Sequence, residues 1–408
     1  MNPRFLVPGV DSTTPLSAAA PAILATKAAP LFQLEGAARS GADADAVHDM
    51  RVASRRLREA WRLFSPLYDE SASAGWFASI RRVTRTLGPV RDSDVFIEAF
   101  SELCEGIGEG GRRAIAFLVG HRLGQRERQL EELNAELARL DLGRARKQFA
   151  KLTRTVAKSA HSQRPLADFA HAAVAERAAV VFGLQPDALA EENVSLQHAL
   201  RIDYKRLRYA VEALAPCYGD EFDAIHAVLT AFQDALGDLH DRHLFLDLVA
   251  AIESEPAARH AGVSEGDFAE VRQALDAAAR EAFERFTRLV AENPPEAMLG
   301  ALLLPLTRRP QAPAAEEAPT DTAGDAPAPE ADAAPEATPD VFALAPGAPA
   351  PEADAAPLRA PAFVAEVRVL DGVDPVIPYI SETGDLVMPA GDLALGPWTA
   401  EGVPEAGE

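Results

Sequence analysis

The chain is 408 residues long, enough for two or three domains, and its 40 basic and 62 acidic side chains give a formal net charge of −22. Spread evenly, such a charge would exclude binding to nucleic acids and other polyanions. The charge is uneven, however, because residues 311–408 hold 19 acidic and 2 basic side chains, whereas residues 1–310 hold 43 acidic and 38 basic ones. The first part of the chain therefore remains a candidate for anion binding.

The sequence shows no pattern typical of export, membrane insertion or a disulfide framework. The N-terminus opens no hydrophobic signal region, and the longest apolar run, Met298 to Leu306, falls far short of the roughly twenty residues that cross a bilayer. Cys104 and Cys217 have no metal-ligand spacing, which indicates free thiols in an intracellular protein. We therefore expect a cytoplasmic protein with no membrane partner.

Residues 12–300 are predicted to fold as one all-α domain of two tandem helical bundles, because apolar residues recur at helical spacing and no run alternates over the length of a strand. The two halves are expected at 15–140 and 165–292, joined by a connector helix at 143–161. Helix breaks are expected at Gly36, Pro66, Gly88–Pro89 and Gly106–Gly111, and then at Gly183–Pro186, Pro216–Gly219, Gly237 and Pro256.

The long helix predicted at 43–65 collects its basic residues on one side. At 100° per residue the basic and imidazole side chains fall within an arc of about 80°, with large apolar side chains opposite. The cationic stripe is His48, Arg51, Arg55, Arg58 and Arg62, and the apolar stripe is Met50, Leu57, Trp61 and Phe64. The apolar side is expected in the core, which leaves the cationic side facing solvent or an anion.

The same arrangement recurs 150 residues later, on the helix predicted at 187–215. The template His-x-x-Arg-x-x-x-[Arg/Lys]-Arg-Leu-Arg fits both 48–58 and 198–208. The second stripe is His198, Arg201, Lys205 and Arg208, backed by Leu200, Leu207, Val211 and Leu214. Pro15-Leu16 also aligns with Pro165-Leu166, which extends the match beyond the stripe. Two copies of one cationic pattern predict one anion held by two equivalent halves.

A charged stripe on an amphipathic helix is more often only a solvated face. Three features favour an anion here: the stripes lack acidic partners, their like charges repel at roughly 0.2–0.5 kcal/mol per i,i+4 pair, and the pattern occurs twice. In the second copy Glu212 stands where the first has Arg62. We therefore expect the first half to bind its anion more strongly.

The connector helix carries a third cationic stripe, Arg144, Lys147, Lys151, Arg154 and Lys158, opposite a modestly apolar face. A binding role and a solvated connector are left equally open for it. Beyond it, residues 301–362 form a Pro/Ala-rich acidic linker that is predicted to be disordered, in which Ala326–Pro335 recurs at Ala348–Pro357. Residues 363–408 regain apolar residues and a turn signal at Thr383-Gly384, which indicates a short β-like element or a docking peptide.

The two motifs resemble those of the CHAD domain, the conserved histidine α-helical domain. The residues that carry the resemblance are Val47-His48 through Arg58 and His198 through Glu212, together with the segments Leu87-Gly88-Pro89-Val90-Arg91-Asp92 and Leu236-Gly237-Asp238-Leu239-His240-Asp241. The resemblance covers about residues 12–295. Pro89 and Asp203 are local departures from the family pattern.

The resemblance implies two helical bundles related by a pseudo-twofold axis, with a basic surface and a central cavity, that bind inorganic polyphosphate and associate with polyphosphate granules. We expect no catalytic residue, cofactor or resident metal. Ligand contacts would fall on His48, Arg51, Arg55, Arg58, His198, Arg201, Lys205 and Arg208. Second-tier candidates are Arg62, Arg91, Arg206 and Tyr209, and Lys147, Lys151 and Arg154 of the connector. The acidic tail would shield the basic groove or recruit a granule-associated protein.

Three alternatives stay open beside polyphosphate binding. A metal site could use His48, His198, His240 and His243 with Asp92, Asp238 and Asp241 nearby, but their cationic neighbours disfavour a divalent ion. A polyphosphate-processing enzyme would need a carboxylate-held metal or a phosphate loop. The available carboxylates, Asp92, Asp94, Asp238 and Asp241, fit better as helix N-caps after the Gly breaks or as partners of Arg91 and Arg242. A helical scaffold could instead bind an acidic protein. Specific nucleic-acid recognition is not expected, because no aromatic residues interleave with the stripes.

Overall fold

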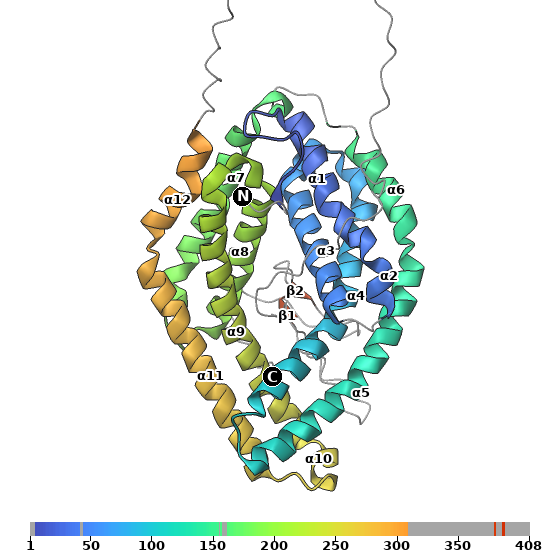
Figure 1. Ribbon diagram of the computed structural model, residues 1–408, viewed down its shortest axis with the longest axis vertical. Helices are drawn as coiled ribbons and strands as arrows, with labels where there is room; N and C mark the ends of the chain where they lie inside the picture. Colours follow the sequence, from blue (N-terminus) through green and yellow to red (C-terminus); the bar gives the residue numbers. More distant parts are fainter. Residues whose placement is uncertain are drawn as a thin grey trace, which may run out of the picture. The chain divides into compact units, whose positions relative to one another are not determined.

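The computed structural model describes residues 5–40, 44–154, 156, 161–308, 379–380 and 386–387. The chain divides into two compact units, Met1–Phe363 and Val364–Glu408. All helices belong to the first unit, which confirms the all-α prediction (Figure 1). In the described part of the chain, no helix has an apolar stretch long enough to cross a membrane.

The first unit contains two successive series of helices. The first series is α1 (Leu16–Gln33), α2 (Glu35–Ser40), α3 (Ala44–Phe64), η2 (Ser65–Leu67), α4 (Glu70–Leu103), α5 (Glu109–Leu140) and α6 (Leu142–Thr153). After η3 (His161–Gln163), the second series is α7 (Leu166–Ala188), α8 (Val194–Ala213), η4 (Ala215–Cys217), η5 (Gly219–Glu221), α9 (Phe222–Ser254), α10 (Pro256–His260), α11 (Glu265–Glu292) and α12 (Pro295–Thr307). The long helices follow one another in a similar order in both series, but α2 has no counterpart between α7 and α8, and α10 has none between α4 and α5. The internal repeat and the pseudo-twofold relation stay predictions.

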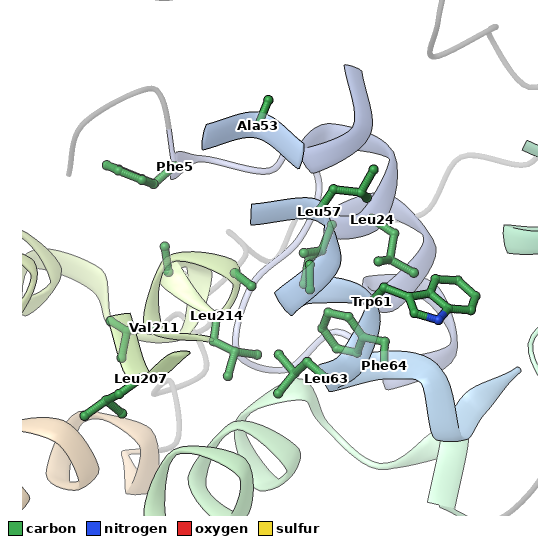
Figure 2. Packing of buried hydrophobic residues seen from close by; sticks show 14 of the residues in the cluster. Phe5, Leu24, Ala53, Leu57, Trp61, Leu63, Phe64, Leu207, Val211 and Leu214 are labelled. Carbon is green, nitrogen blue, oxygen red and sulfur yellow. The ribbon is translucent and has the colours of Figure 1, made fainter. Parts of the chain in front are cut away.

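The two series meet at their first residues, along α3 and α8, and between α5 and α11, where a second apolar cluster also includes residues of α4 and α9. Pro15 and Pro165 form an isolated antiparallel bridge, in which Leu16 N donates to Arg164 O and Leu166 N donates to Thr14 O, each at 2.9 Å. One hydrophobic core runs through both series. Figure 2 shows Leu63 of α3 close to Leu214 of α8. Phe64, Val211 and Leu214 belong to the stripes that the sequence pattern assigned to the core, whereas Leu63 does not.

Three predicted helix breaks are wrong. Helix α4 runs unbroken through Gly88–Pro89, α7 through Gly183–Pro186 and α9 through Gly237. At Gly88 the glycine serves packing instead, because a Cβ there would lie 3.0 Å from Nη1 of Arg51. Consequently Asp92, Asp94, Asp238 and Asp241 lie inside helices, and the prediction that they are N-caps is also wrong.

Three helix boundaries differ from those predicted. The second motif helix begins at Val194 rather than at 187, because α7 continues through Gly183 and Pro186 to Ala188. Helix α6 ends at Thr153 rather than at 161. Helix α12 extends to Thr307, into the segment predicted as linker from 301, because Met298, Leu302 and Leu306 recur at helical spacing and are buried.

The second unit contributes one short strand pair. Strand β1 (Tyr379–Ile380) pairs antiparallel with β2 (Leu386–Val387), with Tyr379 opposite Val387. The pair flanks the Thr383-Gly384 turn signal. The predicted acidic linker from residue 309 onward, and the apolar segment at 363–370, lie outside the described residues.

Candidate functional site

The cationic stripes of α3 and α8 are buried, not solvent-facing. In α3, Arg51, Arg55 and Arg58 are 5%, 7% and 6% exposed. In α8, Arg201, Lys205 and Arg208 are 2%, 8% and 4% exposed, and His48 and His198 are half-buried. Burying six positive charges is costly unless they are compensated, which removes the interpretation of the stripes as solvated faces.

Arg51 is held by the neighbouring helix α4. Its Nη1 donates to the Thr84 carbonyl oxygen at 2.8 Å, and the Thr84 hydroxyl donates to Ser54 Oγ of α3 at 3.0 Å. Gly88, one turn beyond Thr84, gives the guanidinium room against the α4 backbone. The Leu-Gly pair that suggested a turn therefore marks a close approach between a cationic side chain and a helix.

Histidines and cations of α8 and α9 converge in the second series. The Nδ1 atoms of His198 and His240 lie 3.1 Å apart, and their ring centroids are separated by 4.3 Å. Burial lowers the pKa of His240 well below 6.5, and Arg201, His198 and Lys205 lower it further. His240 is therefore neutral at neutral pH, and the field around it is positive.

Glu212 joins the two series at the α3–α8 contact. Its carboxylate is completely buried and accepts from Arg56 Nε at 2.7 Å and from Arg208 Nη1 at 3.0 Å, while His226 Nε2 lies 3.0 Å away. Burial alone would raise the pKa of Glu212, but Arg56 and Arg208 outweigh it and hold that pKa well below 4.5. Arg208 also donates through Nε to Gln233 Oε1 at 2.8 Å, so it is fixed from two sides.

The structure does not support the reason given for stronger anion binding by the first half, which was the exchange of Arg62 for Glu212. Arg62 does not add an uncompensated charge to its stripe, because it forms an ion pair with Glu59. Glu212 compensates Arg56 of the first series as well as Arg208. The difference between the two positions therefore does not make the first half the more cationic one.

The second-tier residues fall into buried, half-buried and exposed groups. Arg91 is 1% exposed, and burial lowers its pKa although Asp94 and Glu98 raise it. Arg206 forms an ion pair with Asp203 at 2.8 Å, and Tyr209 lies under the Arg208 guanidinium at 4.9 Å. Lys147, Lys151 and Arg154 are exposed on α6, away from the buried stripes, while Lys158 lies outside the described residues.

A buried charge cluster between α4 and α5 was missed by the sequence analysis. Arg122 of α5 is 4% exposed, and burial lowers its pKa to about 10 despite the nearby Asp92. Arg126 forms an ion pair with Asp94. The charged residues of α5 show no spacing that distinguishes Arg122 and Arg126 from solvent-exposed residues. Their acidic partners, Asp92 and Asp94, lie about thirty residues earlier in the chain, so a pattern within α5 cannot predict the cluster.

The His and Asp residues considered for a metal do not gather into a ligand set. Within the described ranges, no group of three or more His, Cys, Asp or Glu side chains lies close enough to hold an ion. His198 and His240 are adjacent, but Arg201 and Lys205 are among the charges that act on them. That the protein needs no metal stays a prediction.

We expect the stability of the protein to fall as the pH drops below about 6.5. His240 and His243 have pKa values lowered by burial, so the unfolded chain binds more protons than the folded one at mildly acidic pH. The stabilising contribution is complete above the unfolded pKa of about 6.5 and is lost as the pH falls toward the folded pKa. Urea denaturation at a series of pH values measures it.

His240→Gln should flatten this dependence, whereas His260→Gln, at an exposed site, should leave it unchanged. An unfolding free energy that stays constant from about pH 7.5 to 5.5 would contradict the argument. A bound anion favours the imidazolium, so anion affinity should also rise as the pH falls.

The chain matches the family model described as the CHAD domain over residues 22–250. Among solved structures, it is similar to the crystal structure of the CHAD domain from the plant Ricinus communis, with 23% identity and a TM-score of 0.49, covering 75% of this chain and 96% of that one. It is also similar to PptA from Streptomyces chartreusis, with 17% identity and a TM-score of 0.50, covering 72% of this chain and all of that one. A comparison with curated proteins finds no match. With the motif helices, their burial and a family match over more than half of its length, the chain belongs to the CHAD-domain family.

Proposed function

We propose that the protein binds inorganic polyphosphate without catalysis, through the buried cationic residues of α3 and α8. The observation that carries this proposal is the burial of six basic side chains, each at most 8% exposed, on two helices in contact. At His240, burial lowers the pKa and the charges of Arg201 and Lys205 lower it further, so the surroundings of the α8 stripe carry a positive potential. A polyanion threaded among these side chains would offset the repulsion and the cost of their burial.

The residue types suit anions with paired oxygens, such as phosphate. Five of the six buried cations are arginines, whose planar guanidinium donates two parallel hydrogen bonds to phosphate oxygens. Membership of the CHAD family supports polyphosphate in particular. Affinity would arise mainly from charge pairing and counterion release, as for nucleic-acid backbones, so it should be strongly salt-dependent.

The carboxylates near the site support binding rather than phosphoryl transfer. A transfer reaction uses acidic side chains to hold a metal against the phosphate. Asp94 instead forms an ion pair with Arg126, and Asp238 forms one with Arg285. These acids balance charges of the protein itself. Phosphate release from long-chain polyphosphate that a metal chelator abolishes would overturn the non-catalytic part of the proposal.

We place the protein in the cytoplasm, at polyphosphate granules, with the acidic tail shielding the basic site or contacting a granule-associated protein. The charge contrast between residues 311–408 and the helical domain supports this role. Deleting residues 310–408 and measuring polyphosphate affinity tests the shielding version. Shielding predicts tighter binding after deletion, and unchanged affinity would overturn it.

A competition experiment tests the proposal as a whole. Labelled long-chain polyphosphate is bound at near-physiological salt and displaced by unlabelled polyphosphate of graded length, single-stranded DNA or an acidic peptide. We expect polyphosphate to displace the label at concentrations at least about tenfold below those of DNA or peptide, because the stripes lack stacking residues for bases. Equal displacement by DNA, or by the acidic peptide, would favour a general anion binder or a protein scaffold instead.

A further inference from the structure

Helix α6 and its C-terminal cap residue carry a row of exposed cations that is separate from the buried stripes. The side chains in this outer stripe are Arg144, Lys147, Lys151 and Arg154. Within the part of the chain that the structure describes, none of the four forms an ion pair with a carboxylate. They lie on one face because their spacing of three and four residues matches the helical repeat.

Folding does not require these charges. The opposite face of α6, formed by Leu142, Ala145, Phe149 and Thr153, is buried against α1 and α4. Helix α12 follows α11 as α6 follows α5, and it packs on α7 as α6 packs on α1, yet its span Pro295–Thr307 contains no Lys or Arg. In the second series, α12 therefore takes the place that α6 has in the first series, and it does so without a row of cations.

We propose that the outer stripe is a second contact surface for the same polyanion, engaged only by chains long enough to extend beyond the buried cations of α3 and α8. This inference rests on the proposed binding of polyphosphate. The four side chains span about 15 Å along the helix at 1.5 Å per residue, which suits an extended chain of like charges. They are exposed, so they can take up such a chain without rearrangement of the core.

The arrangement of the helices sets the length dependence. Helix α4 contacts both α3 and α6, so a polyanion must extend across about one helix diameter, roughly 10 Å, to contact both the buried and the outer stripe. A short polyphosphate that fills the buried site cannot reach α6, whereas a long one can contact both surfaces at once. Simultaneous contact converts the second binding step into an intramolecular one and raises the affinity for long chains alone.

The test is a full-length variant with Arg144, Lys147, Lys151 and Arg154 all replaced by Gln, which keeps helix propensity while removing charge. Polyphosphates on the order of three and of a hundred phosphates are titrated over a range of salt concentrations. We expect about tenfold or greater loss of affinity for the long chain, and a fall of up to about 3 in its logarithmic salt slope. Short-chain affinity should change by less than about twofold.

The matched control replaces Arg112, Arg259, Arg280 and Arg288 by Gln, removing the same charge from exposed positions on α5, α10 and α11. It should bind both chains as the wild type does. Equal losses of long-chain affinity in the two variants, or unchanged long-chain affinity in the α6 variant, would overturn the proposed role of the outer stripe but not the proposed function. So would tighter binding of single-stranded DNA than polyphosphate at α6, or a loss that disappears when residues 310–408 are deleted. If the wild-type protein binds no polyphosphate, the proposed function itself fails.

Discussion

Lys205→Met should weaken polyphosphate binding by about 10- to 100-fold, the effect of losing one charge-assisted hydrogen bond worth about 1.5–3 kcal/mol. Lys205 is 8% exposed in the middle of the α8 stripe, and its charge lowers the pKa of His240. Methionine keeps most of the length of the side chain. Removing the charge also removes repulsion from Arg201 and His240, so we expect the ligand-free protein to be no less stable than the wild type.

Three measurements separate a ligand-binding role from a structural one. Calorimetric titration should show the loss of affinity, urea denaturation should show an undiminished unfolding free energy, and NMR titration should show the pKa of His240 rising toward 6.5. Arg206→Met is the control. Arg206 is next to Lys205 on the same helix, but it is half-exposed and forms an ion pair with Asp203. If stability and affinity fall together in Lys205→Met, the stripe is structural.

Glu212→Gln should lower the unfolding free energy by about 3–5 kcal/mol, because it removes one partner of a buried charge network. Its carboxylate is the common acceptor for Arg56 and Arg208, so the substitution leaves buried positive charge uncompensated. Urea denaturation with fluorescence detection measures the loss.

Glu59→Gln offers the comparison for that measurement. Glu59 pairs with Arg62 on the same α3 helix, with both partners partly exposed, and such pairs contribute at most about 1 kcal/mol. If the two variants lose equal stability, the Glu212 network does not hold the two series together as argued. Adding Arg56→Met to Glu212→Gln should recover part of the stability, because one buried charge is then removed with its partner.

Local periodicity predicted the parts of this fold that depend on one helix at a time. Leu57, Trp61 and Phe64 were assigned to the core from their spacing, and they are buried. The same periodicity placed Arg51, Arg55 and Arg58 on the opposite face but could not tell whether that face met water or another helix. That distinction depends on the contact of α3 with α4 and α8, which no pattern within one helix encodes.

Glycine was the other source of error. Gly88 and Gly237 were taken as helix ends, since glycine is unfavourable inside a helix. Inside α4 the cost of Gly88 is offset by the close approach of Arg51, which lies 33 positions earlier in the chain than its hydrogen-bond partner Thr84. The ion pair between Arg56 and Glu212 joins residues 156 positions apart, and the ion pair between Asp94 and Arg126 joins residues 32 positions apart. A pattern within one helix cannot predict either contact.

The bridge between Pro15 and Pro165 affects the order in which the protein folds during translation. Phe64 stacks on Phe169 at 5.4 Å, so the first motif helix finishes its packing only against residues from the second series. At about 5–20 residues per second, the ribosome needs roughly ten to thirty seconds to deliver α7 and α8 after α1 has emerged. During that interval the part of the apolar face of α3 that packs on the second series is open to solvent. The nascent first series is therefore a natural client for chaperones, and neither series alone should yield a soluble fragment.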